Sequence, residues 1–363
     1  MKKVHNFSAG PAVLPAEVLK EAAQATIEFN NSGMSILEVS HRDKDFMNVM
    51  EEARSLVKEL MGLGSGYQVL FLGGGASTQF AMVPSNLLIK DRPAAYVNTG
   101  VWASKAIKEA KFIGNVNVIA SSEDKKFSYI PKGYTVPTDS SYLHVTSNNT
   151  IYGTQMHSFP QSSVPFVCDM SSDIFSRQRD FSKFDLIYAG AQKNIGAAGA
   201  TVVVVKEDIL GKTGRKMFSM LDYGVHIKGE SMYNTPPVFS VYVCLLTLKW
   251  LKKNGGLAWI EKLNDEKANT IYSEIDRNTL FTGTCEKEDR SKMNACFLLK
   301  KPELEETFNK MWKEAGISGI KGHRDVGGYR ASLYNALPLE SVKVLVDVMK
   351  EFEKKYADSK VTA

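Results

Sequence analysis

Two residues of the chain stand where apolar runs end, and both have side chains that can do chemistry. Asp169 follows the apolar residues 164–168, whereas Lys193 follows residues 186–191 and precedes the small residues 196–200. Burial lowers the pKa of an amine, and the neutral amine is the form that attacks a carbonyl carbon. An aspartate in this place can equally be a helix cap, and most lysines are surface charges. The pair therefore predicts either amine chemistry at a strand edge or two ordinary loop residues.

A glycine-rich turn precedes this pair in the chain. Residues 73–78 read Gly-Gly-Gly-Ala-Ser-Thr and join an apolar run to a helical one. Glycines let the backbone approach an anion closely, and the free N–H groups at a helix start point at it. The turn matches neither the phosphate loop of nucleoside triphosphatases nor the dinucleotide fingerprint. It predicts either an anion site of another kind or a tight strand-to-helix turn.

Together with Trp102, which begins the next helix, these residues meet the requirements of pyridoxal phosphate. The aldehyde of that cofactor needs an amine, and its pyridinium nitrogen needs a carboxylate that keeps it protonated. Its phosphate needs helix N–H groups, and its ring needs a flat partner. The amine would come from Lys193 and the carboxylate from Asp169, 24 residues earlier. The glycine-rich turn would supply the N–H groups, and Trp102 would be the flat partner. The combination predicts a pyridoxal phosphate site.

The elements that must position these residues follow from hydrophobic periodicity. Apolar residues recur at helical spacing from 45 to 61, from about 77, and from 101 to 112. Short apolar runs typical of strands lie at residues 67–72, 94–97, 116–120, 142–145, 164–167, 186–188 and 201–205. Strands that alternate with helices indicate an α/β fold whose mostly parallel sheet is flanked by helices on both faces. Ligands bind at the carboxyl ends of strands in such a sheet.

The last third of the chain changes character. Helical spacing dominates from 241 to 264, and a strand (295–299), a helix (304–315), a strand (330–334) and a final amphipathic helix follow. This order indicates a smaller α+β domain at the C-terminal end. We place the boundary near residue 260, which gives a large cofactor-binding domain (16–260) and a small domain (1–15 and 261–363).

Composition excludes several classes of protein. Of the 363 residues 44% are apolar and 23% charged, as in an ordinary globular protein, and the net charge of +5 is spread without a long basic run. No nucleic-acid partner is therefore implied. The four cysteines lie far apart without a histidine cluster, which predicts free, mostly buried thiols in a reducing compartment and no metal site. No apolar stretch is long enough for a signal peptide or a membrane span, so we expect a cytoplasmic protein.

The sequence also resembles a known family over essentially its whole length. It resembles the phosphoserine aminotransferase family, which belongs to the class V aminotransferases of fold type I. The resemblance is carried by residues 6–12 (NFSAGPA), 40–42 (SHR), 149–153 (NTIYG), 190–196 (GAQKNIG), 233–237 (YNTPP) and 321–332 (KGHRDVGGYRAS). The lysine block and the last, glycine–arginine block are specific, whereas the glycine-rich turn is not. The fold implied is a large sheet domain with a smaller C-terminal domain.

The resemblance implies a role for each cofactor-binding position. Lys193 would hold pyridoxal phosphate through a Schiff base and then shuttle the proton between the substrate's α-carbon and the cofactor. Asp169 would pair with the pyridine nitrogen, Trp102 would stack on the ring, and Thr150 would bind the phenolic oxygen. The residues that would bind the phosphate are Ala76, Ser77 and Gln192, with Asn234 and Thr235 from a second subunit. A homodimer with shared active sites is therefore implied.

The resemblance also implies substrates and their partners in the protein. The reaction would convert O-phospho-L-serine and 2-oxoglutarate to 3-phosphohydroxypyruvate and L-glutamate by ping-pong kinetics, in serine biosynthesis. Arg330 would bind the α-carboxylate, because a guanidinium binds a carboxylate through two parallel hydrogen bonds. His41, Arg42, His323 and Arg324 would meet the phosphate or the distal carboxylate, with His41 and Arg42 contributed by the partner chain.

The sequence departs from the family pattern at a few positions and leaves alternatives open. Ala197 stands where proline is common, Tyr329 where methionine is common, and Ala76-Ser77 where some members have Gly-Arg. A cysteine desulfurase is a rival activity, although no cysteine lies in a glycine-rich loop. A non-catalytic binding protein is another, against which the intact lysine and aspartate argue. Whether 4-phosphohydroxythreonine is a second substrate stays open.

Overall fold

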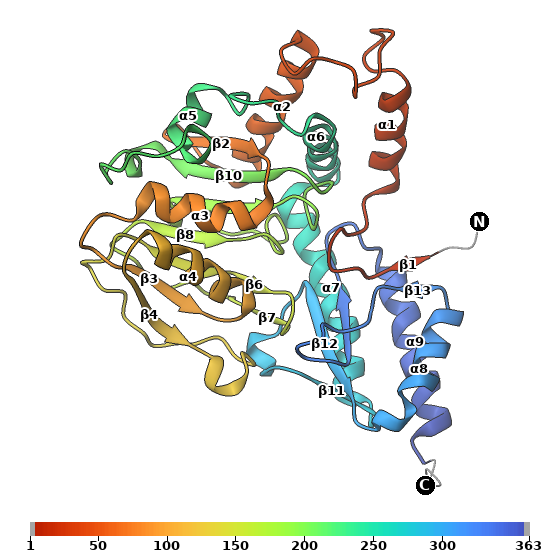
Figure 1. Cartoon of the computed structure of the whole chain (residues 1–363). Helices are drawn as coiled ribbons and strands as arrows, with labels where there is room; N and C mark the ends of the chain where they lie inside the picture. The colour runs from red at the N-terminus through yellow and green to blue at the C-terminus, as the bar shows by residue number, and fades with distance from the viewer. Residues whose placement is uncertain (1–3, 359–363) are drawn as a thin grey trace.

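The chain folds around a seven-stranded sheet (Figure 1). The computed structural model describes residues 4–358. The strands lie in the order β2-β10-β9-β8-β5-β3-β4, and β10 runs antiparallel to both of its neighbours. Their bounds are Tyr67–Leu72 (β2), Ala94–Asn98 (β3), Val116–Ser121 (β4), Leu143–Thr146 (β5), Phe166–Asp169 (β8), Leu186–Gly190 (β9) and Thr201–Lys206 (β10). The prediction of an α/β fold with a mostly parallel sheet is confirmed.

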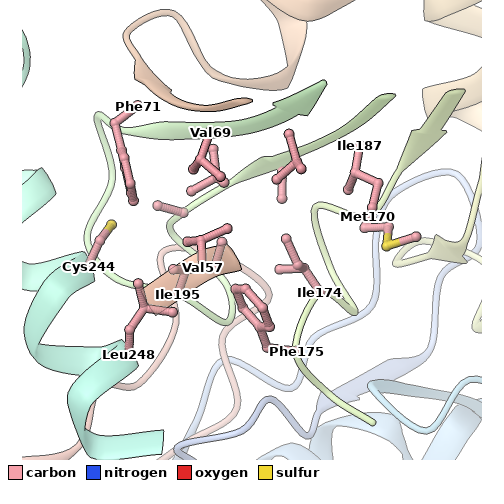
Figure 2. Close-up of a cluster of buried hydrophobic side chains, with 14 of the residues drawn as sticks. Val57, Val69, Phe71, Met170, Ile174, Phe175, Ile187, Ile195, Cys244 and Leu248 are labelled. Carbon is pink, nitrogen blue, oxygen red and sulfur yellow. The ribbon is translucent and has the colours of Figure 1, made fainter. Parts of the chain in front are cut away.

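Helices cover both faces of this sheet because alternate strand residues point to opposite sides. Val69 and Phe71 of β2 enter one apolar core, whereas Leu70 and Leu72 enter the other. The first core is closed by α1 (Ala16–Ile27), α2 (Lys44–Met61) and α6 (Val238–Lys253), and the second by α3 (Gly75–Leu87), α4 (Val101–Ile113) and α5 (Tyr223–Lys228). Figure 2 shows Val69 and Phe71 facing side chains of α2 and α6. The central strands are thereby shielded from water, whereas β4 at the edge of the sheet stays partly exposed.

The C-terminal part forms a third core around a three-stranded antiparallel sheet in the order β11-β12-β14. Its strands are β11 (Phe281–Gly283), β12 (Asn294–Leu299) and β14 (Tyr329–Ser332), and its helices are α7 (Gly256–Arg277), α8 (Glu305–Glu314) and α9 (Leu339–Tyr356). The start of the chain joins this part, since β1 (His5–Asn6) pairs with β13 (Ile317–Ser318) (Figure 1). Phe7 is buried in the same core.

The predicted boundary at residue 260 lies inside α7. Ile260, near the start of that helix, packs in the core of the large sheet, whereas Ala268, Ile271 and Ile275 pack in the C-terminal core. The helix therefore bridges the two parts, and a division at this residue stays a prediction.

Several elements differ from the expectation. The helical pattern predicted over 241–264 is two helices, α6 and α7, which break at Asn254 and Gly255 where the backbone of Gly255 takes a φ of 109°. β14 ends at Ser332 rather than at residue 334. Helix α1, strand β11 and the short hairpin of β6 (Asn148–Asn149) and β7 (Thr154–Gln155) were not predicted. These elements are short or have weak hydrophobic periodicity, so their formation depends on the elements against which they pack.

The four cysteines are free thiols, three of them buried and Cys285 partly buried, which confirms that prediction. Among the helices of residues 4–358, none is long and apolar enough to span a membrane.

Candidate active site

A cavity of about 380 Å³ lies at the carboxyl ends of β5, β8 and β9, against the C-terminal part. Nine of the residues predicted from the sequence line it: Ala76, Ser77, Trp102, Thr150, Asp169, Gln192, Lys193, His323 and Arg330. A larger and more open hollow of about 740 Å³ lies between residues 130–136 and 156–163. Its lysine, Lys132, is ion-paired with Glu288 and Asp289 and offers no unpaired amine. The smaller cavity is therefore the candidate site for the predicted amine chemistry.

Asp169 is the last residue of β8, and strands on both sides hold it. It pairs with Thr146 of β5 and Tyr188 of β9, and its carboxylate accepts a hydrogen bond of 2.9 Å from the backbone N–H of Ser171. Burial raises the pKa of this carboxyl group above its ordinary value, while the hydrogen bonds from Ser171 and the charge of Lys193 act in the opposite direction. A cationic N–H partner placed against it would offset the cost of burying its charge.

Lys193 stands in the turn that follows β9. The turn is tight, since the N–H groups of Ile195 and Gly196 both donate to the carbonyl of Ala191. Gly196 is required there, because a Cβ at this position would lie 3.0 Å from the backbone of Cys244 in α6. The side chain of Lys193 is partly buried and opens on the cavity, with its Nζ 5.6 Å from the centre of the Trp102 ring.

The electrostatics of Lys193 suit an amine nucleophile. Burial lowers its pKa to about 8, with a further lowering from the charge of Arg330, and the carboxylate of Asp169 acts in the opposite direction. At pH 7 about one amine in ten is then neutral, compared with fewer than one in a thousand for an ordinary lysine. The structure thus supplies a reactive amine near neutral pH.

Trp102 and Thr150 form one wall of the cavity. Trp102 lies in the first turn of α4, and its indole N–H donates to the hydroxyl of Thr150 over 3.1 Å. That hydroxyl keeps its own proton free to donate to an acceptor in the cavity. Arg330 of β14 donates from Nη1 to the backbone carbonyl of Thr150 over 3.1 Å. The contact ties the C-terminal sheet to the wall of the cofactor cavity.

Helix α3 begins at Gly75, two residues before the predicted start, and its first three residues line the cavity. No side chain caps this helix end. Its N-cap residue, Gly74, has a φ of 91°, and a Cβ there would overlap the hydroxyl of Thr78. Ala76 and Ser77 lie in the first turn, where backbone donors lack intrahelical partners. The backbone alone can therefore bind a phosphate, whatever the side chains at 76 and 77.

The polar groups around the cavity fit pyridoxal phosphate. Within residues 4–358, Thr146 Oγ1 and Arg330 Nε are buried polar atoms without a hydrogen-bond partner, and both residues line the cavity. Buried polar groups nearly always have partners, so these two atoms are available to a polar ligand in the cavity. The lysine amine, the aspartate and the uncapped helix end match the aldehyde, the ring nitrogen and the phosphate of that cofactor.

Five predicted site residues lie outside the cavity of the single chain. They are His41, Arg42, Asn234, Thr235 and Arg324. The side chain of Arg324 is 91% exposed, with its Nε 3.6 Å from a carboxylate oxygen of Asp325. His323, its neighbour, does line the cavity, with its Nδ1 3.4 Å from the other carboxylate oxygen of Asp325.

The structure also adds cavity residues that sequence reasoning missed. They are Ala9, Gly10, Thr146, Asn148, Ile151, Ser171 and Ser172, whereas Gly75, which also lines the cavity, belongs to the glycine-rich turn predicted as an anion site. Two signals could have found some of them: the first two belong to the N-terminal family block, and the two serines lie two and three residues after Asp169.

Comparisons with known proteins agree with this geometry. Residues 4–345 match the family described as aminotransferase class-V. The chain is 66% identical to the phosphoserine aminotransferase of Flavobacterium psychrophilum and 56% identical to that of Bacteroides fragilis, over 98% of this chain and 100% and 99% of theirs.

Solved structures give the same result. The phosphoserine aminotransferase of Bacillus circulans subsp. alkalophilus superposes with a TM-score of 0.95 at 46% identity, over 98% of this chain and 99% of that one. The pyridoxal-phosphate-bound phosphoserine aminotransferase of Trichomonas vaginalis superposes with a TM-score of 0.91 at 36% identity, over 96% and 100% of the two chains. The chain therefore belongs to the class-V aminotransferase family, within its phosphoserine aminotransferase branch.

Proposed function

We propose that the protein transaminates O-phospho-L-serine with 2-oxoglutarate, giving 3-phosphohydroxypyruvate and L-glutamate in serine biosynthesis. The observation that carries the proposal is the amine of Lys193, with a pKa lowered to about 8, in a cavity that also holds Asp169 and Arg330. The names and the 56–66% identity of full-length relatives support the substrates. Pyridoxal phosphate, when bound, supplies the electron sink that stabilises negative charge at the substrate's α-carbon.

The chain's own residues divide the work. Lys193 would hold the cofactor and, as a free amine, would take up the proton of the substrate's α-carbon. Asp169 would keep a proton on the ring nitrogen, and Trp102 would provide a flat surface for the ring. Arg330 binds the α-carboxylate that both amino-acid substrates share. Because the amino group is stored on the enzyme between the two half-reactions, the kinetics are ping-pong.

A cysteine desulfurase would need a mobile, reactive thiol. The thiols of Cys285 and Cys296 instead donate to the carbonyls of Gly153 and Ile151, and burial raises the pKa of each to about 12. A thiol with so high a pKa is a poor nucleophile at neutral pH. Transamination is therefore the better supported activity. The free thiols also suit a cytoplasmic location, which is part of this proposal.

The family resemblance assigns Arg42 and Arg324 to the phosphate of the substrate, and this assignment makes a specificity prediction. A charge-assisted hydrogen bond is worth roughly 1.5–3 kcal/mol, so losing one lowers kcat/KM by about ten- to a hundredfold. Arg324→Ala and Arg42→Ala are expected to have this effect with phosphoserine and hardly any with alanine, which lacks the phosphate. Arg330→Ala is expected to impair both substrates. Steady-state kinetics with the two amino acids measure the difference.

Lys321→Ala is the matched control for Arg324→Ala, since it removes an exposed cation from the same loop without a predicted substrate contact. It is expected to leave both kcat/KM values within about twofold of wild type. Equal losses for alanine and phosphoserine in Arg42→Ala and Arg324→Ala would mean that neither arginine binds the phosphate.

The proposed enzyme is a homodimer whose sites are shared between the subunits. Asn234 and Thr235 are exposed in the single chain and lie outside the cavity, although the family resemblance assigns them to the cofactor phosphate. Large apolar side chains are also exposed in the single chain: Tyr233, next to Asn234 in the sequence, by 49%, Leu37 by 65% and Phe218 by 81%. A second copy would bury this apolar surface and bring the missing polar groups to the site.

Subunit complementation tests the shared site. Lys193→Ala and the double variant Asn234→Ala/Thr235→Ala are each expected to be nearly inactive. In a mixed dimer one site carries both lesions and the other carries none. An equal mixture that exchanges subunits freely should therefore recover about a quarter of the wild-type activity. Mixed wild-type subunits bearing two different tags report the exchange, and exchange without recovery would show that each site is built within one chain.

A further inference from the structure

Helix α7 carries a lysine that the proposed reaction does not use. Lys267 has no exposed surface, and its Nζ donates to the backbone carbonyls of Leu333 and Tyr334, both over 2.8 Å. Burial lowers its pKa to about 7. A neutral amine still carries two N–H groups, as many as there are carbonyls to satisfy, so both bonds can form with or without the charge. Methionine would fill a similar volume without the cost of burying an amine.

The two carbonyls belong to a segment, residues 333–335, that directly follows β14. Leu333 is three residues after Arg330, which faces the cavity from that strand. After Leu333 the chain leaves the sheet. The backbone groups of the segment therefore need hydrogen-bond partners other than a neighbouring strand. Lys267 supplies these partners for the carbonyls of Leu333 and Tyr334, whereas the N–H of Leu333 donates to the carbonyl of Met293 over 2.7 Å.

The same segment is hydrogen-bonded to two other parts of the chain that form the cavity. Tyr334 donates from its hydroxyl to the carbonyl of Ala9 over 2.9 Å, and Ala9 lines the cavity. The backbone N–H of Asn335 donates to Oδ1 of Asn194, the residue after Lys193, over 3.1 Å. The side chain of Asn194 in turn donates to the carbonyl of Ile174 over 3.0 Å.

A second side chain of α7 holds the segment from the same helix. Asn264, one turn before Lys267, donates to Oδ1 of Asn335 over 2.9 Å and to the carbonyl of Ser176 over 2.8 Å. Asn335 itself donates to the carbonyl of Phe175 over 2.9 Å. The helix that bridges the two parts of the molecule is thus hydrogen-bonded to the segment between Arg330 and the Lys193 turn.

We infer that Lys267 is a positioning residue for the reaction: through the carbonyls of residues 333 and 334 it sets the place of Arg330 relative to Lys193. The inference rests on the proposed function, in which Arg330 binds the α-carboxylate of every amino-acid substrate. Loss of such a contact, made equally in the ground and transition states, raises KM and leaves kcat unchanged. The effect should be the same for phosphoserine and glutamate, because they share the α-carboxylate.

Lys267→Met in the holoenzyme tests the inference. We expect KM to rise about tenfold for both amino acids with kcat within about twofold of wild type, and the absorbance of the bound cofactor to be unchanged. Amide hydrogen exchange, followed by mass spectrometry, should become faster in peptides covering residues 329–335. Lys262→Met, the same substitution at an exposed lysine of α7, is expected to change none of these.

Ile271→Ala separates positioning from stability. It removes a fully buried side chain of the same helix from the C-terminal core, so it should lower Tm without changing KM. If Lys267→Met lowers Tm in the same way and leaves KM and the exchange of residues 329–335 at wild-type values, its role is structural only and the inference is wrong.

Asn335→Ala serves if Lys267→Met does not fold. This substitution keeps Lys267 and both carbonyls but removes the hydrogen bonds of the Asn335 side chain. We expect KM to rise for both amino acids. An unchanged KM would overturn the inference. Wild-type protein that does not transaminate phosphoserine would contradict the proposed function instead. The KM comparison then uses whichever amino acid the wild type accepts, because Arg330 would meet the α-carboxylate of any of them.

Discussion

Lys193→Ala is expected to end covalent capture of pyridoxal phosphate and to lower transamination by at least about ten-thousandfold, while the fold stays intact. The variant loses both the amine that attaches the cofactor and the base that moves the α-proton. Mass spectrometry after borohydride reduction measures capture, and coupled assay of 3-phosphohydroxypyruvate measures turnover. Circular dichroism and Tm should match those of the wild type, because the removed side chain opens on a cavity.

The control for this variant is Lys105→Ala. The Nζ of Lys105 lies 4.8 Å from the centre of the same Trp102 ring, but the residue is exposed. It should keep capture and turnover near wild type. A Lys193→Ala protein that still becomes covalently labelled would show that another amine attaches the cofactor.

The pH dependence of capture follows from the same lysine. Its pKa is lowered to about 8, so protonation blocks the amine below that pH and the neutral form dominates above it. For the wild-type apoprotein, the rate of capture should rise about tenfold per pH unit below pH 8 and level off above it. A rate that keeps rising towards pH 10 would mean that the amine has the pKa of an ordinary lysine.

Asp169→Asn is expected to keep covalent capture and to lower kcat by about a hundred- to ten-thousandfold. The amide oxygen can still accept the hydrogen bond from the N–H of Ser171, so the end of β8 stays in place. What is lost is the negative charge that keeps a proton on the ring nitrogen, and an unprotonated ring is a weaker electron sink.

Asp169→Glu provides the comparison, because it restores the charge at a displaced position and should recover part of the rate. Stopped-flow absorbance of the first half-reaction separates the chemical step from substrate binding. An Asp169→Asn enzyme with the wild-type rate would remove Asp169 from the mechanism.

Much of the large sheet could be predicted because hydrophobic periodicity is a local property of the chain. The run over residues 67–72 became β2 with the same bounds, and the helix predicted over 45–61 became α2, one residue longer. The strand-end places of Asp169 and Lys193 followed from the same patterns. Their chemistry could be inferred because few cofactors need an amine, a carboxylate and an anion-binding helix end together.

Elements without strong periodicity needed tertiary structure. Helix α1 packs on α6, and the hairpin of β6 and β7 consists of two residue pairs that are stable only when buried. The division between α6 and α7 depends on the left-handed backbone of Gly255, which an apolar pattern does not specify.

In the active site, the sequence by itself determined which residues could react, and the tertiary structure decided what holds them. Arg330 and the carbonyl of Thr150 are 180 residues apart in the chain, Trp102 and Thr150 are 48 apart, and Lys267 and Leu333 are 66 apart. Contacts of this kind form only when distant segments of the chain pack together in the folded protein, since no local pattern specifies which distant groups meet. The lowered pKa of Lys193 also depends on the folded structure, because burial in the cavity removes water from its amine.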